Sequence, residues 1–327
     1  MNIFISATNH HLIQVNEAIN YYNIQASDAI LLFLQVGKDE LNRSLLSAQI
    51  PSFTFKSWIF KDIFFNKRLY KEYIAFLNNI NKRNNCIRLF TNQYYSDYSL
   101  LAYFILKPSE TILMDEGTAS FKVVIDRKEH RLINYKLLIK SFLYKKNLAY
   151  PKKLTFFTQY YLTVRTTDKI QNYSFKKIEN SITINNKAAI ILGTSLTELG
   201  VVDYDRYLNI LNGIHKYLSN NGYTVIQYYC HRKEQEQKLK DIEALGYSIV
   251  KNKIPFEFLF PQMKSCPGKI YCFMSPILDS ISKQYANIPE FIIIHLEGKD
   301  LKTKKLKLYK EIYNNYKHNP SLQILNI

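Results

Sequence analysis

Short apolar runs alternate with longer amphipathic stretches along most of the chain. Four such runs in the first half predict strands, and three stretches with a 3.6-residue period predict helices. The strands are expected at 3–6, 29–36, 87–91 and 111–114, and the helices at 11–22, 68–81 and 135–144. Strands this apolar are typical of parallel sheets that are covered on both faces. The pattern therefore predicts an α/β fold.

The same alternation starts again in the second half. Strands are expected at 188–193, 223–229, 248–250, 269–274 (with a helix after it) and 291–295, and helices at 204–220 and 234–245. Between the halves, residues 151–187 are polar and aromatic and have no clean period. We therefore expect an N-terminal domain at 1–155, a connecting region at 156–187 and a C-terminal domain at 188–327. Two Rossmann-like domains in series would place a ligand cleft beyond the carboxyl ends of their strands.

The length and charge narrow the class of protein. A chain of 327 residues suits two domains, and its formal net charge of +17 comes from 44 Lys and Arg against 27 Asp and Glu. Such a balance favours an anionic partner, which leaves nucleic acid, a membrane surface or a phosphate-bearing substrate. The lysines are spread along the chain and no nucleic-acid-binding module is recognisable. We therefore expect no nucleic-acid partner, although a non-catalytic anion-binding protein stays open as an alternative.

The cysteine spacing argues against a disulfide-rich or zinc-binding protein, and the sequence shows no signal peptide or membrane-spanning segment. Cys86, Cys230, Cys266 and Cys272 have neither disulfide-scaffold nor zinc-ligand spacing, so reduced thiols and no metal site are expected. The first residues do not resemble a signal peptide, and no apolar run reaches 18 residues. This predicts a cytoplasmic protein. The lysine-rich stretch at 299–327 would either pack its apolar side on the body or lie on the inner face of an anionic membrane.

Two carboxylates follow the strand at 111–114. Asp115, Glu116 and Gly117 come directly after this buried run, so they are expected at the carboxyl edge of the sheet, where α/β proteins bind ligands. A carboxylate there could accept a proton from a hydroxyl nucleophile, and the glycine would let the backbone approach a substrate. The alternative is a surface turn, which Asp-Glu-Gly also favours.

A cationic group follows the strand at 223–229. His231, Arg232 and Lys233 stand at the entry to a helix, whose N-terminus adds its own preference for anions. An imidazole beside a phosphate can neutralise it and can protonate it as it leaves. This segment is therefore a candidate phosphate site, whereas the other histidines are scattered and are expected to be structural.

Three further segments carry candidate binding groups. Gly193, Thr194 and Ser195 form a small, hydroxyl-rich step after a strand, where backbone amides could approach a nucleotide. Ser275 precedes Pro276 at the start of a helix, so it either caps that helix or binds an anion. Glu257 lies among aromatic residues, as an exposed helix residue or as a buried partner for a ribose.

Together these segments resemble glycosyltransferase family 52, whose members include bacterial sialyltransferases of lipooligosaccharide and capsule assembly. The likeness covers nearly the whole chain. Its most specific part is the segment 115–118 with the strand before it, and the segments 193–198 and 255–257 support it.

The resemblance implies a GT-B fold, with the acceptor on the N-terminal domain and the nucleotide on the C-terminal domain. It implies inverting transfer of sialic acid from CMP-sialic acid to a glycan or glycolipid hydroxyl, most simply that of a terminal galactose, without a metal or cofactor. Asp115 would be the general base, with Glu116 as the second candidate, and His231 would act on the departing CMP phosphate. Ser275 would bind that phosphate and Glu257 the ribose. The family also leads us to expect a homodimer.

Two departures from the family pattern keep the donor open. The family usually has His-Pro where this chain has His231-Arg232, and two hydroxyl residues where it has Ser275-Pro276. Loss of the proline removes a fixed φ that helps to aim the imidazole. A hexosyltransferase of the same fold that uses another nucleotide sugar is therefore the alternative enzyme.

Overall fold

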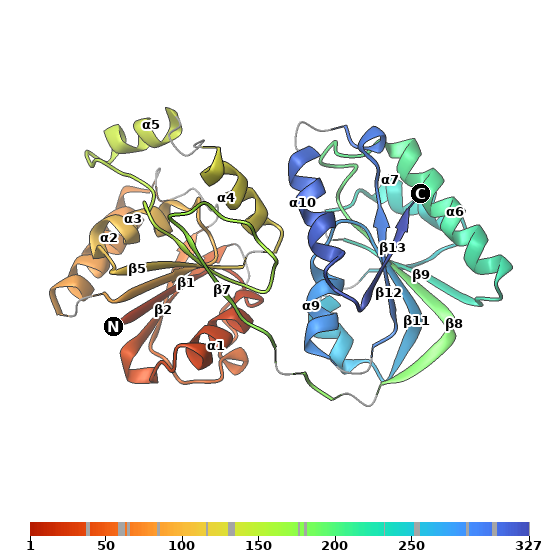
Figure 1. Cartoon of the computed structure of the whole chain (residues 1–327), viewed down its shortest axis with the longest axis horizontal. Coiled ribbons are helices and arrows are strands. Elements are labelled where there is room, and N and C mark those ends of the chain that lie inside the picture. The colour runs from red at the N-terminus through yellow and green to blue at the C-terminus, as the bar shows by residue number, and fades with distance from the viewer. Residues whose placement is uncertain are drawn as a thin grey trace. The chain divides into compact units, whose positions relative to one another are not determined.

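In the computed structural model, the chain forms two compact units, Met1–Ser174 and Phe175–Ile327. It describes all residues except 37–39, 58–62, 64–65, 84–85, 116, 130–134, 176, 180–181, 232, 252–255, 286–287, 303–305 and 327, and except the side chains of residues 36, 57, 83, 135 and 136. Each unit is a parallel β-sheet with helices on its faces (Figure 1). The predicted α/β class is therefore confirmed.

The first unit has a seven-stranded sheet in the order β3-β2-β1-β4-β5-β6-β7. Its strands are β1 (Asn2–Ser6), β2 (Ala29–Val36), β3 (Ser52–Ser57), β4 (Arg88–Thr91), β5 (Glu110–Met114), β6 (Thr155–Thr158) and β7 (Lys169–Asn172). Its helices are α1 (His11–Tyr21), α2 (Lys67–Arg83), α3 (Asp97–Leu106), α4 (Ala119–Lys128) and α5 (Tyr135–Leu143).

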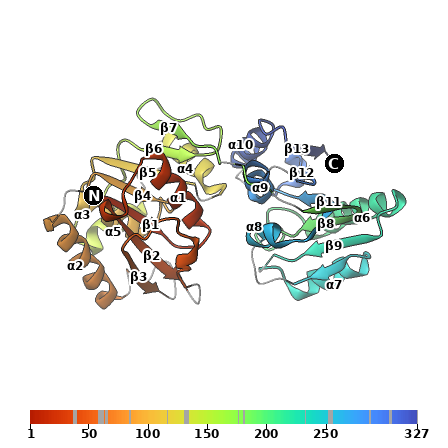
Figure 2. The same cartoon turned by 90° about the horizontal axis from the view of Figure 1, so that it is seen from below.

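The two faces of this sheet bury alternate side chains of the same strands. Ile3 and Ile5 of β1 face a core that α2, α3 and α5 complete, whereas Phe4 points the other way and stacks on Phe90 with ring centroids 4.4 Å apart. Figures 1 and 2 show α1 alone on one side of the sheet, opposite α2, α3 and α5. Because both faces are covered, the central strands are apolar on both sides.

The second unit has a six-stranded sheet in the order β10-β9-β8-β11-β12-β13. Its strands are β8 (Thr183–Leu192), β9 (Val225–Tyr229), β10 (Ser248–Val250), β11 (Ser265–Cys272), β12 (Glu290–His295) and β13 (Leu322–Asn326). Its helices are α6 (Tyr204–Asn220), α7 (Glu236–Ala244), α8 (Phe256–Leu259), α9 (Ile277–Gln284) and α10 (Leu306–Tyr316). With β8 counted as the first strand, the order 3-2-1-4-5-6 is that of a Rossmann fold, and the first unit has the same order with a seventh strand.

The region expected to connect the domains is mostly part of the first unit. β6 pairs with β5 and β7 pairs with β6, both in parallel, so residues 155–172 extend the first sheet. The division falls between Ser174 and Phe175, which lies inside the segment 156–187 that we expected to be a connection. The strands went unrecognised because β6 has only four residues and β7, at the sheet edge, is largely polar.

The lysine-rich C-terminal stretch packs its apolar side on the second unit. Ile312, Tyr313 and Tyr316 of α10 are buried, and the Tyr313 hydroxyl donates to Ile294 O and accepts from Leu296 N. Of the two expectations for this stretch, the structure therefore agrees with the packed helix. In the part of the chain that the structure describes, no helix has the length and apolarity needed to cross a membrane.

Candidate active site

Three neighbouring strands of the second sheet end at the same level. Leu192 of β8 is in register with Tyr229 of β9 and with Cys272 of β11. The residues that follow these strands therefore emerge together at the carboxyl edge, and they include Gly193, His231 and Ser275. The strand order reverses between β8 and β11, which is the position where open α/β sheets bind their ligands.

The His231 turn is held by hydrogen bonds within the segment. The backbone N–H of His231 donates to Glu234 Oε2 at 2.7 Å, and the N–H of Lys233 donates to His231 Nδ1 at 3.3 Å. Because Nδ1 accepts this bond, the neutral ring carries its proton on Nε2. The His231 side chain is half-buried and Lys233 is exposed, whereas Arg232 lies outside the described residues.

A buried ion pair lies beneath this turn. Lys238 Nζ is 2.7 Å from Glu234 Oε1 and donates to Thr194 O at 3.0 Å, so it joins α7 to the loop after β8. The Tyr228 hydroxyl donates to Glu234 Oε1 at 2.6 Å and is 2.8 Å from the Tyr207 hydroxyl. The network therefore fixes the Thr194 loop and the His231 turn relative to one another.

The pKa values of two acids in this network, Glu234 and Glu198, are shifted in opposite directions. Burial raises the pKa of Glu234, and the nearby Lys238 ammonium opposes that shift. At Glu198 burial also acts to raise the pKa, but backbone hydrogen bonds, the Thr197 hydroxyl and Lys238 together lower it. Lys238 Nζ lies 3.4 Å from Glu198 Oε2, so the ammonium forms ion pairs with the carboxylates of both Glu198 and Glu234.

Gly193 is required by the packing of its neighbours. A side chain at this position would collide with Glu234 Oε2 and would come within 2.8 Å of the Tyr228 hydroxyl. That the Gly193 loop lines a nucleotide pocket stays a prediction, and the space beside the Gly193 Cα is filled by the buried network. The loop amides of Thr194 and Ser195 stay candidates for nucleotide contact.

Ser275 and Glu257 both lie near the buried Cys272 thiol. Ser275 Oγ accepts from Ile277 N at 3.4 Å, so it meets the start of α9, which begins one residue after Pro276. Glu257 is half-buried in the short helix α8. Burial raises the pKa of Cys272 to about 12, and the Glu257 carboxylate adds to this shift. The thiol therefore stays protonated near these two predicted donor-binding groups.

The carboxyl edge of the first sheet carries a buried polar cluster. Ser6 Oγ donates to Asn92 Oδ1 at 3.0 Å, and Asn92 Nδ2 donates to Asp115 O at 2.9 Å. Thr158 Oγ1 donates to Asp115 Oδ1 at 2.7 Å. These residues end or follow β1, β4, β5 and β6, which are adjacent strands. The cluster thus spans the point at which the order of this sheet reverses.

Asp115 lies inside this cluster and is only 2 % exposed. Besides Thr158, its carboxylate accepts from Ser120 Oγ at 3.1 Å and from Gln159 N at 2.9 Å. Gly117 adopts a left-handed φ of 54°, which explains a glycine at the turn into α4. Glu116 lies outside the described residues. Asp115 is therefore a tightly held carboxylate at the strand end, and not part of a loose surface turn.

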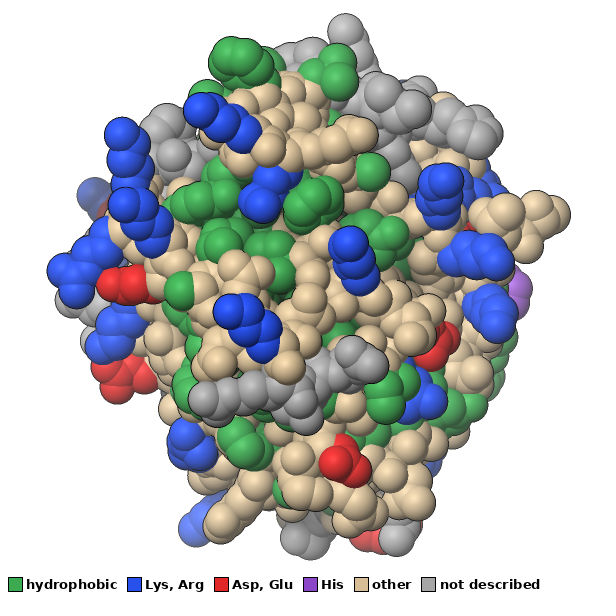
Figure 3. Space-filling model, turned by 90° about the vertical axis from the view of Figure 1, so that its left-hand side faces the viewer, with side chains coloured by type: hydrophobic (Ala, Val, Ile, Leu, Met, Phe, Trp, Pro, Cys, Tyr) green, Lys and Arg blue, Asp and Glu red, His purple; other side chains and the backbone are tan. Residues whose placement is uncertain are grey.

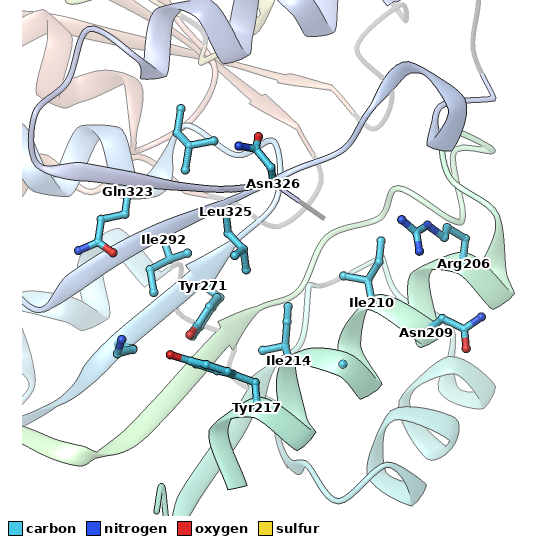
Figure 4. A pocket seen from close by; sticks show the side chains of 13 residues that line it. Arg206, Asn209, Ile210, Ile214, Tyr217, Tyr271, Ile292, Gln323, Leu325 and Asn326 are labelled. Carbon is cyan, nitrogen blue, oxygen red and sulfur yellow. The ribbon is translucent and has the colours of Figure 1, made fainter. Parts of the chain in front are cut away.

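A pocket of about 420 Å³ lies elsewhere, on the face of the second sheet beside α6. In Figure 4, Ile210, Ile214 and Tyr217 of α6 stand along one side and Tyr271, Ile292 and Leu325 of the sheet along the other. None of the residues predicted for the donor or acceptor site lines it. It is thus separate from the strand-end groups.

The sequence interpretation missed the residues that support the site. Glu234 and Lys238 lie in the helix expected at 234–245 and carried no predicted role, although their i,i+4 spacing is that of an ion pair. Ser120, Thr158 and Gln159 carried no motif that linked them to Asp115. Within the described ranges, no three His, Cys, Asp or Glu side chains are arranged to hold a metal ion.

Among solved structures, this chain is similar to a putative UDP-N-acetylglucosamine 2-epimerase from Listeria monocytogenes. The TM-score is 0.50 at 8 % identity, and the match covers 98 % of this chain and 89 % of that one. A glycosyltransferase from Rickettsia africae matches with a TM-score of 0.49 at 12 % identity, covering 96 % and 94 % of the two chains. At these identities the likeness concerns the fold alone, which is of the GT-B type with two Rossmann-like domains in series.

No curated protein matches this chain in sequence. The sequence model of a family described as "Alpha-2,8-polysialyltransferase (POLYST)" matches residues 2–295. The predicted resemblance to family 52 is thus confirmed at the level of a sialyltransferase-like family, and the assignment to family 52 itself stays a prediction. The predicted class of enzyme, a glycosyltransferase, is also confirmed. Since the match spans both units, the chain belongs to the alpha-2,8-polysialyltransferase family.

Proposed function

We propose that this glycosyltransferase transfers sialic acid from CMP-sialic acid to a glycan hydroxyl, with inversion and without a metal ion. The observation that carries the proposal is the alignment of three strand ends, β9, β8 and β11, which brings His231, the Thr194 loop and Ser275 to one edge of the second sheet. The family match over residues 2–295 supplies the class of sugar.

The second unit would bind the donor. The amides of Thr194 and Ser195 would contact the nucleotide, Ser275 would bind the phosphate and Glu257 the ribose. The Nδ1 of His231 accepts from the Lys233 amide, and in the proposed complex the Nε2–H of the neutral ring would donate to the CMP phosphate. Lys233, which is exposed beside the ring, would add positive charge where the phosphate dianion develops.

The first unit would bind the acceptor, with Asp115 as its general base. The carboxylate lies at a strand end near the reversal point of the sheet, and three donors hold its orientation. Since Asp115 is 2 % exposed, the acceptor hydroxyl must enter the cluster to reach it.

In the proposed reaction the acceptor oxygen attacks the anomeric carbon of the sialic acid as the bond from that carbon to the CMP phosphate breaks. The hydroxyl proton passes to Asp115, and the electron pair of the broken bond stays on the phosphate, which His231 neutralises. The transition state resembles an oxocarbenium ion, so the protein has to supply a base on one face of the sugar and positive charge on the other.

The choice of acceptor to test is based on the family match and not on the geometry of the site. Members of the matched family are described as alpha-2,8-polysialyltransferases, so a glycan that already ends in sialic acid is the first acceptor to test. The galactose-terminated glycan implied by the sequence resemblance is the second.

The test is to mix the full chain with CMP-sialic acid and each acceptor in the presence of EDTA and to measure CMP release and the sialylated product. We expect release that depends on the acceptor and that falls at least 100-fold in His231→Ala, in line with the loss of one acid–base or charge-stabilising group. His318→Ala is the matched control, because His318 is exposed and lies on the turn after α10.

Two results would reject the proposal. One is the absence of CMP release with either acceptor, and the other is equal activity in the parent and in His231→Ala. UDP-linked hexoses are included as donors because Arg232 replaces the usual proline after the histidine. Hexose transfer without sialic acid transfer would assign the alternative donor and reject CMP-sialic acid.

A further inference from the structure

Helix α5 exposes four large apolar side chains on one face. Leu138 is 65 % exposed, Ile139 52 %, Phe142 83 % and Leu143 58 %. Leu138 with Phe142, and Ile139 with Leu143, are four residues apart, so the four side chains share one side of the helix. We refer to these four residues as the α5 patch. Figure 3 shows hydrophobic side chains on the upper part of this face of the first unit, with Lys and Arg side chains around them.

The opposite side of α5 is packed on the unit, which fixes the direction in which the patch points. Leu137 is buried in the core, and the Lys140 ammonium pairs with the Asp97 carboxylate. After the helix, the Tyr144 ring stacks on Tyr70 of α2 with centroids 4.9 Å apart and planes 11° apart. The patch is therefore the outward face of a docked helix.

The charge around the patch is mostly positive, although Glu72 of α2 is also exposed and pairs with Arg68. Residues 135–153 contain six lysines and no aspartate or glutamate. Lys145 is exposed two residues after Leu143, and Lys146 Nζ lies 5.3 Å from the centre of the Phe104 ring. Lys67 and Lys71 are exposed on the first turns of α2, next to the Tyr70 that stacks on Tyr144. The apolar side chains of the α5 patch and several lysine side chains are thus exposed on the same part of the first unit.

This combination fits the surface of an anionic bilayer. Leucine and phenylalanine side chains insert at the boundary of headgroups and acyl chains, while lysines contact anionic headgroups and keep their stems along the apolar region. A second copy of the chain is a poor partner, because a symmetric contact would bring two lysine-rich patches against each other.

We propose that the α5 patch docks this protein on an anionic phospholipid membrane. The C-terminal helix α10 is not the docking element, because its apolar side chains Ile312, Tyr313 and Tyr316 are buried in the second unit. The proposal does not depend on the donor or on the catalytic residues, because it rests on the surface of one helix.

The test is sedimentation of the full chain with vesicles of phosphatidylcholine alone or with phosphatidylglycerol added. We expect binding only to the anionic vesicles, and weaker binding at high salt, because salt screens the lysines. The double variant Leu138→Ser, Phe142→Ser is expected to bind at least tenfold more weakly, as is Lys145→Glu, Lys146→Glu. Thermal unfolding of each variant shows whether the fold is kept.

Two control variants separate α5 from a general effect. Leu199→Ser removes a side chain of the second unit that is also 65 % exposed, and it should bind as the parent does. Lys307→Glu, Lys310→Glu makes the same charge change on α10 and should lower binding much less than the α5 pair does.

Three outcomes would overturn the proposal. They are no binding to anionic vesicles, equal binding in the parent and the folded α5 variants, and loss of binding in the α10 variant alone. The molar mass in solution is measured without lipid as well. A dimer that the α5 variants dissociate would assign the patch to a second copy of the chain and not to a membrane.

Discussion

The ammonium of Lys238 lies 2.7 Å from the Glu234 carboxylate, and neither side chain is more than 1 % exposed. The pair is buried under the two segments that carry the predicted donor site. Since Glu234 also accepts the His231 backbone N–H and Lys238 donates to Thr194 O, the pair acts on the site through the backbone. Both are positioning residues, because neither is expected to touch the substrate.

Removal of Lys238 should destabilise the second unit strongly. In Lys238→Met the buried Glu234 loses its charge partner, and breaking a buried pair costs about 3–5 kcal/mol. The double variant Lys238→Met, Glu234→Gln should regain much of this loss, because no charge is then left buried. Urea unfolding of the parent, the single variants Lys238→Met and Glu234→Gln, and the double variant measures the coupling.

The matched control is the ion pair of Lys251, which follows β10, and Glu236, the first residue of α7. Unlike the pair of Lys238 and Glu234, this pair is exposed. Lys251→Met should leave the unfolding midpoint unchanged, since exposed pairs contribute little. Equal effects of Lys238→Met and Lys251→Met would contradict the role given to the buried pair.

A second prediction concerns two glycines of the second unit. In Gly193→Ala the new methyl group meets the Glu234 carboxylate, which cannot move away because Lys238 holds it, so a loss of about 1–3 kcal/mol is expected from overpacking. Gly213, inside α6, has nothing within 4 Å of an added Cβ. Gly213→Ala should therefore stabilise the protein by about 0.5–1 kcal/mol. Unfolding curves that shift in the same direction for both variants would refute this explanation of Gly193.

The sequence predicted the central strands well and the edge strands poorly. The run at 29–36 coincides with β2, and the stretch at 204–220 coincides with α6, because each has a continuous buried side that gives a clear period. β3, β7 and β13 were not expected, and all three lie at sheet edges, although the edge strand β10 was predicted. The interior strand β6, which has only four residues, was also missed. An edge strand meets solvent, so its side chains are more polar and the apolar run that marks a buried strand is missing.

For the candidate site, the positions of the residues along the chain could be predicted from the sequence, whereas their depth of burial could not. His231 and Asp115 were placed at strand ends from the apolar runs before them, and both are there. The spacing of residues in the sequence did not indicate that Thr158 and Ser120 hydrogen-bond to the Asp115 carboxylate and shield it. Thr158 is 43 positions from Asp115 in the chain and Ser120 is 5 positions from it. Contacts that depend on the tertiary fold leave no local pattern.

The role of Asp115 can be separated from its structural contacts. Asp115→Asn removes the proposed base, and we expect kcat/KM to fall by about 10²–10⁴ and the acid limb of its pH profile to disappear. Thr158→Val removes a donor to the same carboxylate and should cost about 1–3 kcal/mol of stability while the carboxylate stays in place. Activity is measured well below both unfolding transitions. If the two variants lose activity in proportion to stability, Asp115 is structural and another group is the base.

The last prediction concerns acid stability. His11, the first residue of α1, is buried, and its Nδ1 accepts from Ala7 N at 3.4 Å. Burial lowers the pKa of His11 to about 3, and the nearby His10 contributes to the shift. Its usual value is near 6.5, so between pH 6.5 and pH 3 the unfolded chain binds a proton that the folded chain does not. Stability from this group is therefore complete above pH 6.5 and is lost as the pH falls through that window.

His11→Asn should flatten this acid dependence, because the amide oxygen can accept from Ala7 N and does not titrate. Between pH 7.5 and pH 5 the parent should lose about 2 kcal/mol more than the variant, as linkage requires for one such histidine. Urea unfolding at the two pH values measures the difference, and the contributions of all other groups cancel because both proteins share them. His318→Asn, a change at an exposed histidine, should follow the parent. Parallel losses in the parent and in His11→Asn would mean that His11 is charged, or reached by water, in the folded protein.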